Sequence, residues 1–368
     1  MVFGGLFEVA GQPKAKPVII TLVFVVFRLP MNVKGTNAPS KKISTPPPQG
    51  IFAQRLMSWY DQNRRDLPWR KNRDPYRVWI SEIMLQQTRV AAVIDHYHEF
   101  LRRFPTIEKL AAAREASVLA AWSGLGYYRR ARMMHAAAKV VVKECGGRFP
   151  ESSHALQMLP GIGRYTAAAI ASIAFEEPVA VVDGNVERVL QRFSGKKMAR
   201  EEIWEAANHW LDLGRPGDFN QSMMELGAVV CTPRAPSCLV CPVNELCPTR
   251  GELEITEKSA PQKKRKIHYS LICRRKNNRE NKIFLVQRAR DTSLMAGMWE
   301  LPEIPSPRDR SKPIFTLRHS ITVTDYTVQV WQTVPPKLPG KWIPTSRLRK
   351  LALTGLARKI LRKAGILP

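Results

Sequence analysis

The sequence predicts a protein of two domains, an all-α N-terminal domain followed by a smaller α+β domain. The chain has 368 residues, a length typical of two domains. In the first part, apolar residues recur at helical spacings between short turns; later they gather in short runs of β-branched and aromatic residues. The expected division is an N-terminal extension over residues 1–50, a helical domain over 51–250, a charged linker over 251–266 and an α+β domain over 267–368.

Start and stop signals support the helical assignment. Asp74-Pro75 is typical of a helix start, with Asp as the N-cap and Pro in the first turn. Apolar residues at helical spacing then predict one helix continuing as far as Ile94. A further helix is expected to close over Leu119–Gly126, and another over Arg129–Lys143, where a Gly-Gly pair stops it.

The C-terminal part is expected to contain both strands and a helix. Strands are predicted over Ile267–Cys273, Ile283–Gln287, Ser320–Thr324 and Tyr326–Trp331. Ser346 is a suitable N-cap for a final helix that would run through Leu351, Leu356 and Ile360.

The N-terminal extension is unusual. Val18–Phe27 is a ten-residue apolar run, too short to span a bilayer, and no small-residue cleavage site follows it. We expect residues 1–30 to be untranslated or disordered, with synthesis starting at Met31. Residues 31–50 are rich in Pro, Ser, Thr and Lys and are expected to be disordered.

The charge balance predicts a polyanionic partner. The chain carries 58 Lys and Arg against 31 Asp and Glu, a formal net charge of +27. Such an excess favours nucleic acid, with affinity that falls as salt rises. A membrane surface is the alternative, but the arginines are scattered through several helical segments instead of lining one amphipathic helix.

Four of the six cysteines lie in one short stretch, at Cys231, Cys238, Cys241 and Cys247. The spacing is C-x6-C-x2-C-x5-C, and clustered cysteines in a chain without a secretion signal indicate metal binding. Four thiolates suit either zinc or an iron–sulfur cluster. The spacing and the position late in the helical domain favour the cluster. Cys145 and Cys273 stand apart and are expected to be small, buried apolar side chains.

A glycine-rich turn lies between two predicted helices, at Leu159-Pro160-Gly161-Ile162-Gly163. Gly161 and Gly163 allow a tight turn and a close approach to a ligand. The helix that follows presents unpaired N–H groups at its start, which suit a DNA phosphate. An ordinary turn between two helices is the alternative.

Two acidic residues are candidates for catalysis. Asp183 follows an apolar run and precedes the helix predicted over Asn185–Phe193, so it can cap that helix. It can also stabilise the positive charge that develops on a sugar when an N-glycosidic bond breaks. Glu82 has apolar neighbours that would raise its pKa and suit a general acid, although most glutamates on helices are solvated. Tyr127 follows Gly126 on a turn, where an aromatic ring can wedge into a base stack or pack in the core.

Together these residues resemble the MutY family of adenine DNA glycosylases, in the helix–hairpin–helix glycosylase superfamily. The resemblance covers nearly all of residues 51–368. The motifs that carry it are Leu67-Pro68-Trp69-Arg70, Ser81–Thr88, Gly124-Leu125-Gly126-Tyr127-Tyr128, the glycine-rich turn, Val182–Val186 and the four cysteines. The family excises adenine mispaired with 8-oxoguanine or guanine, and it carries a 4Fe–4S cluster and a C-terminal Nudix-like domain that recognises the oxidised guanine.

The resemblance implies a role for each matching residue. It makes Glu82 the acid that protonates adenine at N7 and Asp183 the group that stabilises the sugar cation, with Tyr165 and Asn185 supporting them. It places Arg70 in the adenine pocket. It puts Gln87, Thr88 and Tyr127 against the strand that carries 8-oxoguanine, with Tyr127 as the wedge.

The resemblance also separates this chain from endonuclease III, which has a lysine where Tyr165 stands. Tyrosine cannot form a Schiff base, so a glycosylase without lyase activity is expected. In the C-terminal domain the acidic box of true Nudix hydrolases is missing. The family's lesion-contacting Phe-Ser-His turn is replaced by Arg318-His319-Ser320, so His319 and Ser320 are the candidate lesion contacts, or else simply pack at a strand end.

The expected partner is double-stranded DNA with A·8-oxoguanine or A·G mispairs, bound by a monomer without membrane contact. The expected location is the cytoplasm, associated with the bacterial nucleoid. One rival interpretation is a glycosylase for thymine or another pyrimidine, which the C-terminal domain and Tyr165 disfavour. Another is a catalytically silent iron–sulfur protein that only binds damaged DNA, which the presence of Glu82 and Asp183 disfavours.

Overall fold

The computed structural model describes residues 49–253, 263–276, 279–292, 294–306, 312–321, 323–334 and 339–367. The expectations for residues 1–48, including a start at Met31, lie outside the described residues, and the first helix already begins at Gln49.

The helical domain contains α1 (Gln49–Asn63), a 3-10 turn (Pro68–Arg70), α2 (Pro75–Leu85), α3 (Val90–Arg103), α4 (Ile107–Ala111), α5 (Glu115–Trp122), α6 (Arg129–Glu144), α7 (Ser153–Gln157), α8 (Arg164–Phe175), α9 (Gly184–Ser194), α10 (Arg200–Trp210) and α11 (Pro216–Val229). Short 3-10 turns at Cys238–Val240 and Asn244–Leu246 follow.

The start of α2 is as predicted, but its end is not. The Asp74 carboxylate accepts a hydrogen bond of 2.9 Å from the backbone N–H of Arg77, which caps the helix. The helix predicted to reach Ile94 is wrong, because α2 ends at Leu85 and the chain turns at Gln87, whose φ is 55°. The apolar spacing continued across this turn because α3 packs its own apolar face against the same core.

The helix predicted to close over residues 119–126 ends earlier, at Trp122. Gly124 and Gly126 have φ values of 117° and 71°, so the chain leaves the helix into a left-handed turn that glycine adopts without strain. The turn leaves Tyr127 half exposed on the surface.

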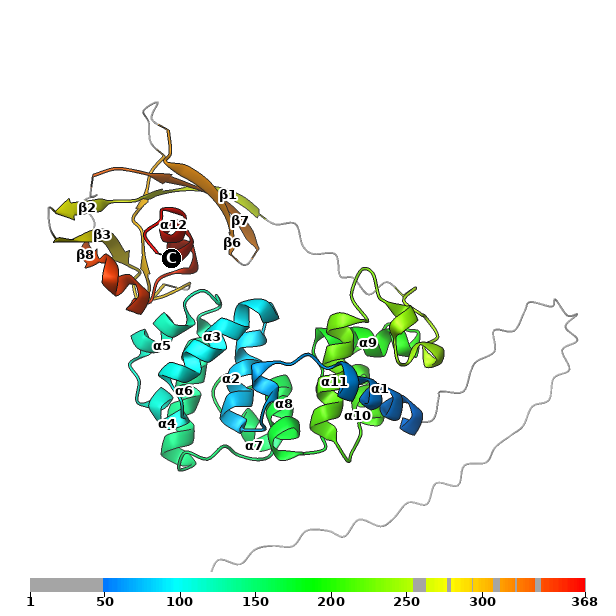
Figure 1. The fold of residues 1–368 in the computed structure, drawn as a ribbon. Coiled ribbons are helices and arrows are strands. Elements are labelled where there is room, and N and C mark those ends of the chain that lie inside the picture. The colour runs from blue at the N-terminus through cyan, green and yellow to red at the C-terminus, as the bar shows by residue number, and fades with distance from the viewer. Residues whose placement is uncertain are drawn as a thin grey trace, which may run out of the picture. The chain divides into compact units, whose positions relative to one another are not determined.

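The helices form two lobes, each with its own core (Figure 1). The first core lies among α2–α8 and contains the fully buried Trp79 and Trp122. The second lies among α1, α9, α10 and α11, where Phe52 and Phe219 are buried. The cysteine-containing segment packs against this second core.

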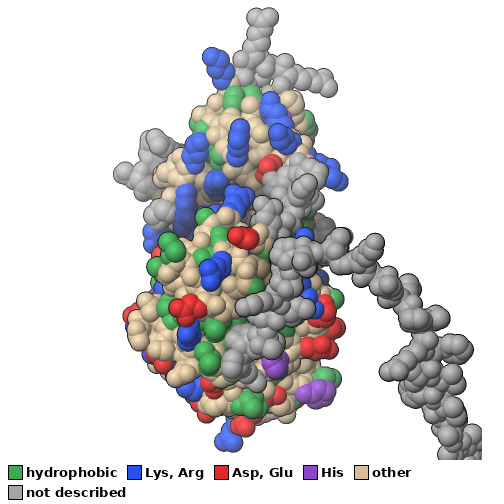
Figure 2. All heavy atoms as spheres, turned by 90° about the vertical axis from the view of Figure 1, so that its right-hand side faces the viewer, with side chains coloured by type: hydrophobic (Ala, Val, Ile, Leu, Met, Phe, Trp, Pro, Cys, Tyr) green, Lys and Arg blue, Asp and Glu red, His purple; other side chains and the backbone are tan. Residues whose placement is uncertain are grey.

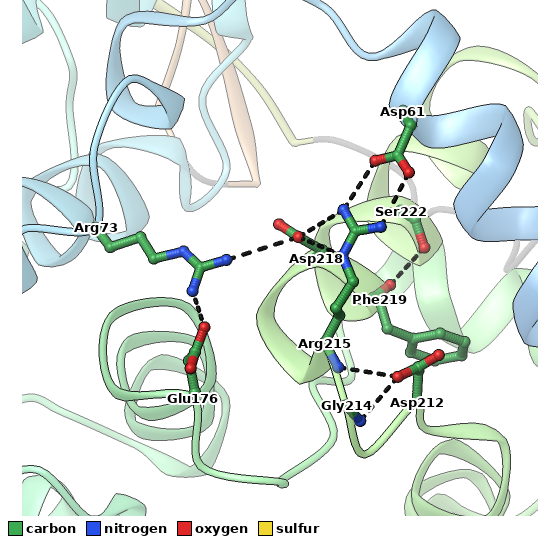
Figure 3. A network of polar contacts seen from close by, with 9 residues as sticks. All are labelled: Asp61, Arg73, Glu176, Asp212, Gly214, Arg215, Asp218, Phe219 and Ser222. Carbon is green, nitrogen blue, oxygen red and sulfur yellow. Dashed lines mark hydrogen bonds and ion pairs between the residues drawn. The ribbon is translucent and has the colours of Figure 1, made fainter.

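An ion-pair network joins the lobes, and Figure 3 shows its side chains pointing toward one another. Arg215, just before α11, donates to both carboxylate oxygens of Asp61 on α1, at 2.8 and 2.9 Å, and to Asp218 at 2.8 Å. Arg73, before α2, pairs with Glu176 at the end of α8 and lies 3.7 Å from Asp218. The network therefore ties the start of α11 to segments of both lobes.

The C-terminal domain is α+β, as predicted. One sheet has the order β5-β1-β7-β6 and contains β1 (Lys263–Ser270), β5 (Glu303–Ile304), β6 (Phe315–Ile321) and β7 (Thr324–Trp331). The other contains β2 (Cys273–Lys276), β3 (Arg279–Gln287), β4 (Trp299–Glu300) and β8 (Gly340–Pro344). The helix α12 (Gly355–Lys363) lies between the sheets and buries Leu356, Ala357, Ile360 and Leu361 against both (Figure 1).

Several boundaries in this domain differ from the sequence prediction. The predicted linker over 251–266 ends early, because β1 begins at Lys263; residues 254–262 lie outside the described ranges. The strand predicted over residues 320–324 is instead the end of β6 and the start of β7. Ser346 does not start the last helix; it lies in a 3-10 turn (Thr345–Lys350), and the Thr354 hydroxyl caps α12.

The surface is basic, as the composition predicts. Figure 2 shows Lys and Arg side chains gathered on the upper part of the face drawn, which is the C-terminal domain. The first half of β1, residues 263–266, consists of four exposed basic residues. Cys145 is half-buried, but Cys273 is exposed, so the buried position predicted for it is wrong. Over the described ranges, no helix has the length and apolar character that crossing a membrane requires.

Candidate active site

A cleft of about 1340 Å³ collects most of the predicted site residues. Those lining it are Arg70, Glu82, Gln87, Thr88, Tyr127, Gly161, Tyr165, Asp183, Asn185, His319 and Ser320. Gly163 and the four cysteines do not line it. The two candidate acids, about a hundred residues apart in the chain, therefore face one shared space, because α2 supplies one and the start of α9 supplies the other.

Glu82 is a buried acid, with only 6% of its surface exposed. The Tyr165 hydroxyl donates a hydrogen bond of 2.6 Å to its Oε2. Burial raises the pKa of Glu82 to about 7, the hydrogen bond from Tyr165 opposes this, and the charge of Asp183 adds to it. A carboxyl group with this pKa can hold its proton near neutral pH and release it to a substrate, as expected from its apolar neighbours.

Tyr165 lies near the start of α8 and supports Glu82 from one side. Burial raises the pKa of its hydroxyl well above the ordinary value, and the charges of Glu82 and Asp183 act in the same direction. The hydroxyl therefore stays protonated and is a donor to the carboxyl. Its oxygen also lies 3.6 Å from the sulfur of Met224 on α11, so both lobes contact it.

Asp183 caps α9, and its carboxylate is held by three donors. Its Oδ1 accepts from the backbone N–H groups of Asn185 and Val186 at 2.9 and 2.8 Å, and its Oδ2 accepts from the Asn185 side-chain amide at 2.9 Å. Donors of this kind and the positive end of a helix stabilise a charged carboxylate. Capping and a place in the cleft therefore coexist at this residue.

The side chain of Asn185 is itself held by Arg188, a residue that the sequence analysis did not identify. Its Nη2 donates to the Asn185 side-chain oxygen at 2.8 Å and to the Gly227 carbonyl at 2.7 Å, and its Nε donates to the Cys231 carbonyl at 2.8 Å. A Cβ atom on Gly227 would lie 2.5 Å from the Cβ of Asn185, so α9 and α11 approach here as closely as glycine allows. The cysteine-containing segment and the Asp183 turn therefore share one support.

Arg70 points into the cleft as part of a buried charge cluster. Its Nη2 donates to Glu225 on α11 at 2.9 Å, and Arg65 makes two further side-chain bonds to the same carboxylate at 2.7 Å. Burial raises the pKa of Glu225, but the two arginines outweigh it and hold the pKa at about 2. Glu225 and Arg65 were not predicted; the signal for them is a glutamate within the apolar stretch of a buried helix, which needs a cationic partner.

Three predicted residues form one rim of the cleft. Gln87 is exposed on the turn after α2, and Thr88 next to it donates to the carbonyl of Gln86. Tyr127 is 50% exposed, so the alternative of core packing does not hold for it. These side chains are available to a ligand in the cleft.

The glycine-rich turn before α8 behaves differently at its two glycines. Gly161 has a φ of 76°, and a Cβ there would lie 2.5 Å from the Cβ of Met133, so both backbone and space require glycine. Gly163 has ordinary extended dihedrals and open space around it, and it precedes the first helical residue, Arg164. A tight turn that requires glycine is therefore found at Gly161 only, while the open space at Gly163 leaves room for a ligand.

His319 and Ser320 lie on β6, within the strand and not on a separate turn. His319 is half-buried, and burial, together with the charge of Lys359, lowers its pKa. The Ser320 hydroxyl is exposed and donates to Asp325. Both residues line the cleft.

The four cysteines line a separate small cavity of about 30 Å³ in the second lobe. The guanidinium of Arg192 donates to the Cys231 sulfur at 3.3 Å and to the Thr232 carbonyl at 2.8 Å, which orders the loop. Their common, mostly apolar cavity fits a thiolate-bound inorganic group. Among the described residues, no three His, Cys, Asp or Glu side chains are grouped closely enough to hold a single metal ion.

Residues 80–212 match the family model of HhH-GPD superfamily base excision DNA repair proteins. The helical domain and its cleft are therefore those of a DNA glycosylase. The chain is 35% identical to the adenine DNA glycosylase of Rattus norvegicus, over 84% of this chain and 77% of the relative, and 34% identical to that of Homo sapiens, over 84% and 73%. The solved structure of a thermostable thymine-DNA glycosylase is 31% identical to this chain, with a TM-score of 0.53. The match covers 56% of this chain and 97% of the glycosylase.

The chain belongs to the MutY family of adenine DNA glycosylases, and the predicted family is confirmed. The enzyme excises adenine from DNA in base excision repair. The rival interpretations, a pyrimidine-excising enzyme and a catalytically silent DNA-binding protein, are thereby set aside.

The raised pKa of Glu82 predicts a pH-dependent stability. Its folded-state pKa, about 7, lies above the ordinary value of 4.5, so its contribution to stability is complete below pH 4.5 and is lost as pH rises through 7. We expect Glu82→Gln to match the wild type at pH 4.5 and to be more stable by about 3 kcal/mol at pH 8. Urea unfolding at both pH values measures this, and a wild type that gains stability relative to the variant toward pH 8 would contradict it.

Proposed function

We propose that the enzyme excises adenine mispaired with 8-oxoguanine or guanine in duplex DNA, and that it hydrolyses the glycosidic bond without cutting the strand. The observation that carries this proposal is the pair of acids in one cleft with opposite environments. Glu82 is buried and can keep a proton, while Asp183 is surrounded by donors that stabilise its charge. A buried carboxyl group beside a carboxylate held by hydrogen-bond donors suits a proton donor beside an electrostatic stabiliser.

The proposed reaction uses each acid once. Glu82 gives its proton to N7 of the extruded adenine, so that the C1′–N9 bond breaks with its electron pair going to the base. Asp183 stabilises the cation that forms on the sugar, by ion pairing or a transient covalent bond. Water then adds to C1′ and gives up a proton, which restores the Glu82 carboxyl group and leaves an abasic site. Tyr165 holds Glu82, and Asn185 holds Asp183.

The rim residues are assigned to the strand opposite the extruded adenine. Gln87, Thr88 and Tyr127 line the cleft together on two adjoining turns, and His319 and Ser320 line it from β6. An exposed aromatic ring beside polar side chains suits a base stack that must be opened. The basic surface and the turn at Gly161–Gly163 would hold the phosphate backbone.

We further propose that the four cysteines hold a 4Fe–4S cluster. When bound, the cluster supplies four metal–sulfur bonds that close the segment of residues 231–247, which has few apolar residues of its own. Arg188 and Arg192 both donate to the backbone of this segment, so its order is transmitted to the turn that carries Asp183 and Asn185.

Substrate preference and chemistry can be tested together. We expect duplexes with A opposite 8-oxoguanine to be processed fastest, then A opposite G, with A·C and A·T far slower, as measured by alkaline cleavage of the abasic product. Asp183→Asn should retain binding to the A·8-oxoguanine duplex but lose about 1000-fold or more in rate, because the sugar cation loses its counter-charge. Equal rates on all four duplexes, or an active Asp183→Asn enzyme, would refute the proposal.

The absence of lyase chemistry gives a separate test. Without an amine in place of Tyr165, borohydride should trap little or no covalent protein–DNA adduct with the wild type. Tyr165→Lys should yield such an adduct, because lysine can attack C1′. Gel shift under denaturing conditions measures both, and efficient trapping by the wild type would show a Schiff-base mechanism.

The cluster assignment predicts the metal content of the purified protein. Anaerobically purified protein should contain about four irons and four acid-labile sulfides per chain. Cys238→Ser should lower both and the visible absorbance, while Cys145→Ser, outside the quartet, should change neither. Zinc in place of iron, with no sulfide, would show instead the other metal centre that four thiolates can form.

A further inference from the structure

Arg130, in the first turn of α6, has a charged side chain that the proposed reaction does not use. Burial lowers its pKa to about 10, which leaves it charged at neutral pH. Within the described ranges no carboxylate pairs with it, and its Nε is enclosed without a partner. Because a desolvated cation is costly unless other groups meet its donors, the partners that it does have are informative.

One set of partners is the end of α2, the helix that carries Glu82. Nη1 of Arg130 donates to the carbonyls of Ile83 at 2.6 Å, Met84 at 3.2 Å and Gln86 at 2.5 Å. Carbonyls at the last turn of a helix lack intrahelical donors and carry the negative end of its dipole. The guanidinium therefore caps α2 from the side, immediately before the turn at residues 87–88.

The other set of partners lies on the turn before α6. Nη2 of Arg130 donates to the Leu125 carbonyl on this turn at 3.2 Å. The same nitrogen also donates, at 3.3 Å, to the hydroxyl of Thr88 on the turn after α2. The guanidinium carbon lies 5.4 Å from the ring centroid of Trp122 and 5.5 Å from that of Tyr127. The planar guanidinium thus contacts both turns of the cleft rim, and its second turn carries Tyr127, the residue expected to wedge into the base stack.

Both turns contain a residue in a conformation that needs support. Gln87 has a φ of 55° and Tyr127 a φ of 45°, in the left-handed region that side chains other than glycine rarely occupy. Such residues persist only where surrounding contacts fix them. Arg130 is bound to the backbone immediately before Gln87, and its charge lies over the Tyr127 ring.

We propose that Arg130 is a positioning residue whose guanidinium clamps the end of α2 to the turn of residues 124–127, and so sets Gln87, Thr88 and Tyr127 for entry into the base stack. This rests on the proposed function in assigning those three side chains to the strand opposite adenine. Lysine cannot replace Arg130, because its side chain ends in a single nitrogen, which cannot reach both turns as Nη1 and Nη2 of arginine do. Loss of the clamp should impair opening of the stack, while Glu82 keeps its environment.

The test compares Arg130→Met and Arg130→Lys with wild type and with Arg102→Met. Arg102 is a matched control, since it is an exposed arginine of α3 paired with Glu99 and lies outside the cleft. The first measurement is the single-turnover rate on an A·8-oxoguanine duplex. The second is the fluorescence of 2-aminopurine placed beside 8-oxoguanine, at saturating protein, which reports unstacking. The third is the pH dependence of the rate.

We expect both Arg130 variants to lose about 10- to 100-fold in the single-turnover rate. They should also lose most of the rise in 2-aminopurine fluorescence. The alkaline limb of the rate, set by Glu82 near pH 7, should not move. Arg102→Met should behave as wild type. If Arg130→Met fails to fold, Arg130→Lys carries the test, since it keeps the charge and most of the stem.

A full fluorescence rise in either folded Arg130 variant overturns the inference. A rate loss accompanied by a shift of the alkaline limb also overturns it, because the residue would then act by holding Glu82 and not the rim. Failure of the proposed function is a different result: the wild type itself would show no preference for 8-oxoguanine opposite adenine.

Discussion

The burial of the Glu82 carboxyl group is the constraint on which the rest of the site depends. In water this group would be ionised at neutral pH and could not serve as an acid. Enclosed by the first lobe, it keeps a pKa of about 7, and its hydrogen-bond donor is the neutral hydroxyl of Tyr165. A cation in the place of this hydroxyl would stabilise the carboxylate and lower the pKa of Glu82, so that the group would be ionised at neutral pH. The negative charge of Asp183 also raises the pKa of Glu82.

The other charges near the cleft do not overturn this balance. Arg65 and Arg70 are paired with Glu225, and although the charge of Arg70 lowers the pKa of Glu82, burial outweighs it. Arg188 and Arg130 are bound mainly to backbone carbonyls and side-chain oxygens, which fixes turns, and within the described residues neither forms a salt bridge with Glu82 or Asp183. Half-buried arginine thus serves as a structural donor at turns that line the cleft.

Much of this was predictable from local rules. Asp74 and Asp183 were identified as N-caps because a carboxylate before a helix satisfies its free N–H groups, and both cap as predicted. The acidic pair was found from chemistry and from family motifs. The errors came where tertiary contacts overrode periodicity. The single helix predicted through residue 94 breaks at a turn whose backbone Arg130 binds, and the last helix begins at Gly355, where the Thr354 hydroxyl caps it. Glu225 was missed because its partners lie far away in the sequence.

The sequence by itself determined the fold class, the family and the identity of the groups able to do the chemistry, because these depend on residue types at short spacings. Only the tertiary structure decided that α2 and α9, from different lobes, turn their acids into one cleft, and how far burial raises the pKa of Glu82. A pKa depends on the solvent and charge that surround a group, and these are fixed by packing between segments that are distant in the chain.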